Sequence, residues 1–466
     1  MEENDKKGIN RRNFLKTLGV GSVATTAAIY GCKPKNTATA EGGSLGEVPT
    51  DKMTYRINPH TGDKVSLLGF GCMRYALRTN DSGEEEIDQD LVNELVDYAI
   101  AHGVNYFDTS PRYVRGMSEK ATGIALSRHP RDKYFIATKM SNFATETRSR
   151  EGSIAMYHKS MEDLQVDYLD YYLLHGIGGG GMEDFKERFM DNGILDFLLK
   201  ERESGRIRNL GWSYHGDIEV FDYLLSLDIQ WDFAMIQMNY VDWKHASGRN
   251  TNAEYLMGEL EKRNVPAVIM EPLLGGRLSR LNTRALKILK TIHPEDTPAT
   301  WAFRYAGTPE SVLTVLSGMV YPEHLQENVR THSPLQPLNE QEYEALEKVT
   351  EIILSNNEIP CTECQYCMPC PYGIDIPEIF AHYNRIVNAG DIMSDENLQN
   401  PNGEEYRKAR RAFLLGYDRS VPKLRQADHC IGCGICNPHC PQRIDIPKEM
   451  QRIDAYAEGL KQGKLI

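Results

Sequence analysis

The chain has few cysteines, and almost all of them stand in two short stretches near its end. Of ten cysteines in 466 residues, eight lie between Cys361 and Cys440. Only Cys32 and Cys72 stand elsewhere, which is not the pattern of a disulfide framework. This uneven distribution indicates metal ligands.

Positive charge is also scarce. The chain carries 53 Lys and Arg against 66 Asp and Glu, a formal net charge of −13. A nucleic-acid partner would require a basic surface, so we expect none. The contents of 41% hydrophobic and 26% charged residues are those of a soluble globular protein, and the length suits a large domain followed by a smaller one.

The apolar run near the N-terminus is too short to span a bilayer. It covers about fifteen residues before Cys32, whereas a spanning helix needs about 20. Arg11 and Arg12 precede it in "RRNFLK", which resembles a twin-arginine export signal; an ordinary amphipathic helix is the alternative. "IYGC" resembles a lipobox, which implies a lipid anchor at Cys32. We expect residues 1–32 to be an export signal, 33–51 to be a linker, and the protein to be periplasmic or membrane-anchored.

Short apolar runs alternate with helical patterns from residue 52 to 335. Alternation of this kind predicts a closed (β/α)8 TIM barrel, with an open doubly wound sheet as the alternative. The eight expected strands are Val65–Gly71, Val104–Thr109, Tyr134–Met140, Leu169–Gly176, Arg208–His215, Phe233–Tyr240, Val265–Pro272 and Val312–Gly318.

Four chemically useful side chains follow three consecutive strands of this predicted barrel. They are Asp108, Tyr113, Lys139 and His175. Each alone has a structural interpretation, such as a turn cap or a buried polar residue. Together they lie at the carboxyl ends of strands, where TIM barrels carry their active sites.

These residue types suit hydride transfer to a carbonyl, because the oxygen that gains charge needs a proton. Tyr113 would donate that proton, and a nearby Lys139 ammonium would lower the pKa of its phenol. Asp108 would keep Lys139 charged, and His175 would orient the carbonyl oxygen. The four residues resemble the catalytic Asp, Tyr, Lys and His of the aldo/keto reductase family. The resemblance spans Met53 to about Arg330 and implies a nicotinamide nucleotide, NAD(P)H, and a small carbonyl or alcohol substrate.

The same resemblance implies where the nucleotide binds. Ser213 in "GWSYH" and Gln237 in "MIQMNY" match residues that contact the carboxamide, and Leu273 lies in the matching loop "MEPLLGGRL". Glu327 and Asn328 match the adenosine end. The family's basic residues for the 2′-phosphate correspond to Gly318 and His324, which weakens the case for NADPH over NADH.

The glycines of "GIGGGG", Gly176–Gly181, imitate a dinucleotide-binding fingerprint. Such a site would need an acidic residue at the end of a second strand, but Asp196 stands in a helical pattern. We therefore expect a loop beside the active site that shapes substrate entry.

The last part of the chain, residues 336–466, is predicted to be a small, mainly helical ferredoxin-like domain. The second of its two cysteine stretches follows the bacterial 4Fe–4S spacing C-x2-C-x2-C-x3-C-P, and the first is one residue tighter at its last step. Both are followed by Pro and Ile-Asp-Ile-Pro and form an internal repeat; two zinc sites are the alternative. We expect Cys370 and Cys440 each to serve the other group's cluster. The expected ligands of two 4Fe–4S clusters are Cys361, Cys364, Cys367, Cys370, Cys430, Cys433, Cys436 and Cys440.

The two halves suggest an oxidoreductase of aldo/keto reductase type, whose clusters exchange electrons with a redox partner protein. There are two alternatives. The first is an electron carrier whose barrel is a docking platform. The second is a binding or structural protein in which the clusters only stabilise the fold. Nicotinamide handles two electrons at once and each cluster handles one, yet the chain has no convincing motif for a mediating flavin.

Overall fold

The computed structural model describes residues 48–248, 250–356, 358–392 and 403–462. The predicted signal, residues 1–32, and most of the linker lie outside the described residues. Residues 48–466 belong to one compact unit. Within the described part of the chain, no helix is both long and apolar enough to cross a membrane.

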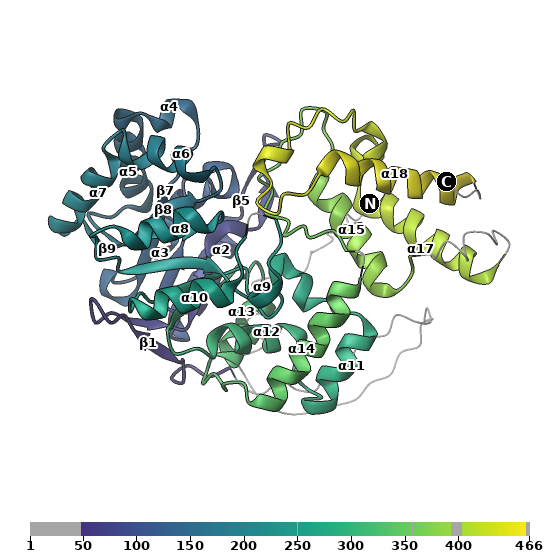
Figure 1. The fold of residues 1–466 in the computed structure, drawn as a ribbon, viewed down its shortest axis with the longest axis horizontal. Coiled ribbons are helices and arrows are strands. Elements are labelled where there is room, and N and C mark those ends of the chain that lie inside the picture. The colour runs from purple at the N-terminus through teal and green to yellow at the C-terminus, as the bar shows by residue number, and fades with distance from the viewer. Residues whose placement is uncertain (1–47, 249, 357, 393–402, 463–466) are drawn as a thin grey trace, which may run out of the picture. The chain divides into compact units, whose positions relative to one another are not determined.

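Eight parallel strands close into a barrel, which confirms the predicted fold (Figure 1). Each predicted strand appears, although the first begins later because Val65 and Ser66 belong to β2 (Lys64–Ser66), which pairs with β1 (Tyr55–Ile57) outside the barrel. A second hairpin joins β4 (Leu77–Thr79) to β5 (Glu85–Ile87). The barrel order is β10 (Phe233–Gln237), β11 (Ala267–Met270), β12 (Val312–Ser317), β3 (Leu68–Gly71), β6 (Tyr106–Asp108), β7 (Phe135–Met140), β8 (Leu169–Ile177) and β9 (Ile207–Tyr214).

Amphipathic helices follow the strands and cover the barrel. Helix α2 begins where the Asp88 side chain accepts a hydrogen bond from the Leu91 amide, and it buries Val92, Leu95 and Val96. The helices are α2 (Gln89–Ala101), α3 (Ser118–Leu126), α4 (Thr145–Arg148), α5 (Arg150–Leu164), α6 (Gly181–Phe185), α7 (Ile194–Glu203), α8 (Ile218–Ser226), α9 (Asp242–His245), α10 (Ala253–Lys262), α11 (Thr283–Ile292), α12 (Pro298–Gly307) and α13 (Pro322–Thr331).

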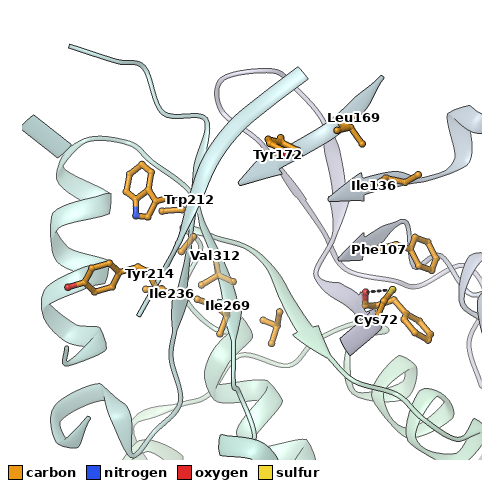
Figure 2. Packing of buried hydrophobic residues seen from close by; sticks show 14 of the residues in the cluster. Cys72, Phe107, Ile136, Leu169, Tyr172, Trp212, Tyr214, Ile236, Ile269 and Val312 are labelled. Atoms are coloured by element: carbon orange, nitrogen blue, oxygen red, sulfur yellow. Dashed lines mark hydrogen bonds between the residues drawn. The ribbon is translucent and has the colours of Figure 1, made fainter. Parts of the chain in front are cut away.

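Large aromatic side chains fill the space between strands and helices. Figure 2 shows Trp212 and Tyr214 in this core with Phe107 and Tyr172. Trp212 is fully buried and packs edge-on against Trp231, with 4.8 Å between ring centroids. Neither Trp212 nor Tyr214 is therefore free to stack on a ligand.

The loop of Gly176–Gly181 packs against the barrel instead of binding a nucleotide. A Cβ on Gly216 would lie 2.0 Å from the Gly178 carbonyl carbon, so the two backbones meet where no side chain fits. Asp196 lies in α7, as the sequence predicts. The loop follows His175 directly but contributes no lining residue to the catalytic cavity described below, and its expected influence on substrate entry stays a prediction.

After the last strand the chain forms α14 (Glu340–Ser355), which returns to the barrel. A reciprocal capping box between Asn339 and Glu342 starts this helix. Its apolar stripe, including Leu346 and Val349, packs with Trp301 in one buried cluster.

A separate apolar core holds the tail together. It is built from α15 (Ile376–Ala389), α17 (Glu404–Ser420) and α18 (Ile446–Gln462), which appear together in Figure 1. Phe380, Phe413 and Met450 are almost fully buried there. The mainly helical character predicted for this region is confirmed, and both cysteine stretches lie in the loops that precede α15 and α18.

Candidate functional site

The structure brings the four predicted catalytic side chains together at the ends of β6, β7 and β8. Asp108 ends β6, Tyr113 follows it in the same loop, Lys139 lies near the end of β7, and His175 lies near the end of β8. All four line one cavity of about 740 Å³. This volume is within the range of small-molecule and cofactor sites, roughly 300–1,000 Å³.

Lys139 and Asp108 form a buried ion pair beneath this cavity. Lys139 Nζ lies 2.6 Å from Asp108 Oδ1 and donates a second hydrogen bond, 2.7 Å long, to the Thr109 carbonyl. Burial raises the pKa of Asp108 and lowers the pKa of Lys139, and the attraction between the two charges opposes both shifts. The pair holds Lys139 firmly in one place.

Tyr113 lies over this pair. The Lys139 ammonium is 4.7 Å from the centroid of the Tyr113 ring. The next two residues, Val114 and Arg115, have φ angles of 48° and 56°, a left-handed conformation that is strained for such side chains. The strained turn fixes the direction in which the Tyr113 side chain extends from the backbone.

The surroundings of Tyr113 favour its neutral phenol. Burial, and then the Asp108 charge, raise its pKa well above 10. The expected lowering of this pKa by Lys139 is therefore absent, because the ammonium lies over the ring and Asp108 already pairs with it. A neutral phenol is nevertheless the form that can donate a proton.

His175 is held as a neutral imidazole. Burial, together with the charges of Lys139 and Arg188, lowers its pKa well below 6.5. Its Nδ1 lies 2.5 Å from Ser141 Oγ, and Arg188 Nη2 donates to its carbonyl over 2.6 Å. If Ser141 donates to Nδ1, the ring proton resides on Nε2 and can be donated to a bound oxygen.

The residues expected at the carboxamide fit a nicotinamide. Ser213, Gln237 and Leu273 line the same cavity. The Gln237 amide nitrogen donates to Asp242 over 2.5 Å, which leaves its buried Oε1 without a partner among the described residues. Ser213 Oγ accepts from the Gly176 amide over 2.9 Å, so its own proton remains available. One acceptor and one donor are what a carboxamide requires.

Glu327 and Asn328 lie in α13 and also line the cavity. Glu327 accepts a hydrogen bond from Thr297, and Asn328 Nδ2 donates to Ser317 Oγ over 3.0 Å. The cavity therefore extends from the catalytic four to the predicted adenosine end.

Sequence reasoning missed several polar residues that line this cavity, including His215, Arg74, Arg280 and Glu271. His215 has a buried Nδ1 without a partner among the described residues, and burial lowers its pKa to about 4. Arg74 and Arg280 bring positive charge, and Glu271 accepts from the Gly275 amide over 2.6 Å. His215 and Glu271 stood in motifs that the sequence singled out, "GWSYH" and "MEPLLGGRL", but neither residue was assigned a role.

The eight cysteines of the tail form two groups of four. One small cavity is lined by Cys361, Cys364 and Cys367 with Cys440 from the other stretch. A second is lined by Cys430, Cys433 and Cys436 together with Cys370. This exchange of the fourth cysteine is the arrangement that the spacing predicts.

Each group surrounds a space instead of converging on a point. Among the described residues, no three or more His, Cys, Asp or Glu side chains are placed to hold a single metal ion. Four cysteines are the ligand set of a 4Fe–4S cluster. The Glu363 amide donates to Cys361 Sγ over 3.4 Å, a contact that would stabilise a thiolate.

Comparison with known families divides the chain in the same way. Residues 67–351 match the aldo/keto reductase family, and residues 360–446 match a 4Fe–4S dicluster domain.

Among curated proteins, Protein tas of Escherichia coli (strain K12) is 29% identical over 198 residues, which are 37% of this chain and 55% of that protein. The chain thus spans about half the length of this relative. L-galactose dehydrogenase of Arabidopsis thaliana is 25% identical over 318 residues, 65% of this chain and 95% of that protein. Among solved structures, an aldo-keto reductase from Bacillus halodurans in its holo form superposes with a TM-score of 0.51 at 24% identity, over 64% of this chain and 96% of that one.

Proposed function

Because the chain belongs to the aldo/keto reductase family, we propose that it is an oxidoreductase that acts on a carbonyl or alcohol with a nicotinamide nucleotide. The observation that carries this proposal is the convergence of Asp108, Tyr113, Lys139 and His175 on one cavity. The unpartnered Oε1 of Gln237 and the free proton of Ser213 support a carboxamide at the same place.

Each residue has a role that follows from its surroundings. When bound, the nicotinamide supplies or takes the hydride. Tyr113 donates a proton to the substrate oxygen through its hydroxyl group, which its raised pKa keeps protonated. His175 donates a hydrogen bond from Nε2 and so orients that oxygen. Lys139 places positive charge beside the developing negative charge, and Asp108 keeps Lys139 in position.

Replacement of Tyr113 tests this proposal. Tyr113→Phe removes the proton donor and keeps the ring, so we expect carbonyl turnover to fall by about 10²–10⁴-fold. Nucleotide affinity, measured by titration of Trp fluorescence, should stay within about threefold because the carboxamide residues are untouched. Tyr255→Phe is the matched control, since Tyr255 is 37% exposed and its hydroxyl donates to Asp222 on the surface. Full activity of Tyr113→Phe would exclude the proposed role.

We further propose that the two cysteine groups hold two 4Fe–4S clusters, which when bound exchange single electrons with a redox partner protein. Two clusters require about eight iron atoms per chain, a content that elemental analysis measures. Anaerobic addition of NADH and then NADPH, with nicotinamide and cluster absorbance followed together, tests whether the nucleotide reduces the clusters. The same titration determines which nucleotide binds. If nucleotide binds while the clusters stay oxidised, hydride transfer and cluster reduction are independent reactions.

The N-terminal motif supports a proposal about location. Arg11 and Arg12 suggest export by the twin-arginine route, and Cys32 suggests a lipid anchor in the periplasm or at the membrane. Replacement of both arginines by lysine should leave the protein inside the cell, as fractionation would measure. Cys32→Ala should release exported protein from the membrane fraction. Unchanged fractionation in both variants would exclude these roles.

A further inference from the structure

The tail supplies one wall of the catalytic cavity. The lining residues from the tail are Thr362, Glu363, Cys364, Tyr366, Pro441 and Gln442. They come from the two segments that carry the first cysteine group, which is formed by Cys361, Cys364, Cys367 and Cys440. Two short loops thus both hold the cysteines and border the space in front of Tyr113.

The first of these loops is fixed to the barrel. Arg74, from the loop after β3, donates to the Thr362 carbonyl over 2.6 Å. Gly275 lies so close that an added Cβ would be 2.3 Å from Thr362 Cα. Nearby, Arg277 and Glu358 form an ion pair of 2.8 Å whose side chains are only 14% and 5% exposed. The position of the loop is therefore determined by contacts with the strand ends.

The second loop is held through Gln442. Its side chain accepts hydrogen bonds from Ser247 Oγ and Asn250 Nδ2, each 3.3 Å long, and the residue is 5% exposed. Gly248 has a φ of 70°, and a Cβ there would lie 2.3 Å from the Gln442 carbonyl group. The Gln442 backbone thus packs against the barrel at Gly248, where only a glycine fits.

Tyr366 lies between the cysteines and the catalytic residues. Its backbone amide donates to the Cys364 thiol, and Tyr366 lines the catalytic cavity together with Tyr113. It lines the catalytic cavity together with His215 and Gln442. All three residues carry hydrogen-bonding groups and line the cavity that is also lined by Tyr113 and His175.

We propose that Tyr366 and Gln442 contact the substrate and select small carbonyl compounds that carry hydroxyl groups. The inference rests on the proposed function of the cavity. A hydroxylated substrate would satisfy the polar groups of this wall, including the unpartnered Nδ1 of His215. An apolar carbonyl of the same size would offer these groups no hydrogen bond and would leave Nδ1 of His215 unpaired, which is the strongest basis for discrimination between similar substrates.

The test compares glyceraldehyde with propanal, which has the same carbon chain without the hydroxyl groups. Full-length, iron-loaded protein is assayed anaerobically with saturating nucleotide, and the ratio of the two kcat/KM values is the readout. We expect Tyr366→Leu and Gln442→Leu each to lower this ratio by about tenfold, because glyceraldehyde loses a hydrogen bond that propanal cannot make. Tyr366→Phe, which loses only the hydroxyl, should give an intermediate ratio.

A binding measurement accompanies the kinetics. Saturation-transfer NMR with erythritol on the iron-loaded, nucleotide-saturated protein should show weaker contact in the leucine variants. Tyr372→Leu is the control, because Tyr372 lies beside the second cysteine group and not in the catalytic cavity. Iron content and nucleotide affinity are measured for every variant. If Tyr366→Leu loses iron, the kcat/KM ratio and erythritol contact of Tyr366→Phe and Gln442→Leu test the proposal instead.

The outcomes are distinguishable. A lower ratio and weaker erythritol contact in iron-loaded variants support the proposal. An unchanged ratio and unchanged erythritol contact overturn it and leave the proposed oxidoreductase function standing. Wild-type protein that binds no nucleotide and reduces neither aldehyde overturns the proposed function and this inference together.

Discussion

The buried pair of Lys139 and Asp108 gives the sharpest prediction. Lys139→Met removes the ammonium and roughly keeps the side-chain volume. The two side chains are only 1% and 3% exposed, so Asp108 would lose its hydrogen bond from Lys139 and could not turn to water. Asp108 Oδ2 already has no partner among the described residues. Removing one member of a buried pair costs about 3–5 kcal/mol, a large part of a typical total of about 5–15 kcal/mol.

The pH dependence distinguishes this explanation from a general packing defect. In Lys139→Met the folded-state pKa of Asp108 is raised above its unfolded value of 3.8. Folding then favours the protonated carboxyl, so stability falls as pH rises through the folded pKa. In Asp108→Asn the folded-state pKa of Lys139 lies below its unfolded value of 10.5, so stability rises with pH. The double variant buries no charge and should recover most of the loss.

Tryptophan fluorescence during urea unfolding is the appropriate assay, because all four tryptophans, Trp212, Trp231, Trp243 and Trp301, lie in the barrel. The four proteins would be compared at about pH 6 and pH 9, always relative to wild type at the same pH. Slopes of opposite sign in the two single variants are expected. Slopes of the same sign, or losses below about 1 kcal/mol in both, would refute the reasoning about this pair.

Two other predictions concern groups outside the cavity. Burial raises the pKa of Glu119 to about 7 from 4.5, so the free energy of unfolding should fall by at most about 1.4 kcal/mol per pH unit across that range. Glu119→Gln should flatten this slope in the same urea assay, whereas the exposed control Glu203→Gln should not. If the slope persists in Glu119→Gln, another group causes the pH dependence. Gly248→Ala should destabilise the contact with Gln442 by about 2 kcal/mol or more, whereas Gly83→Ala, at a φ of 82° with open space around it, should cost only about 1 kcal/mol. Urea unfolding followed by circular dichroism measures both, and equal losses would show that the contact at Gly248 is unimportant.

The barrel and the catalytic four were predictable because both depend on short-range patterns. Strands buried on both faces read as continuous apolar runs, as in "YYLLHG" and "FAMIQ". Once strands are assigned, the rule that active sites lie at their carboxyl ends brings Asp108, Lys139 and His175 together. The exchange of Cys370 and Cys440 was expected from the resemblance of the repeated cysteine stretches to two-cluster ferredoxins.

The substrate wall was not predictable, because it depends on contacts between distant residues. Arg74 and Thr362 are 288 positions apart, and Ser247 and Gln442 are 195 apart. Neither contact produces a periodic pattern in the sequence. The need for glycine at positions 248 and 275 becomes clear only when the backbone that packs against them is known. The only local clue was that Tyr366 stands between two cysteines.

That clue suggests why both chemistries occur on one chain. Cys364 belongs to the first cysteine group and also lines the catalytic cavity, and Tyr366 is only two residues away. A loop that must hold iron cannot move freely, so the side chains it places in the cavity are held in fixed positions. On this argument, iron bound by Cys361, Cys364, Cys367 and Cys440 would also order the substrate wall. Protein depleted of iron should therefore lose its preference for glyceraldehyde over propanal before it loses its affinity for the nucleotide.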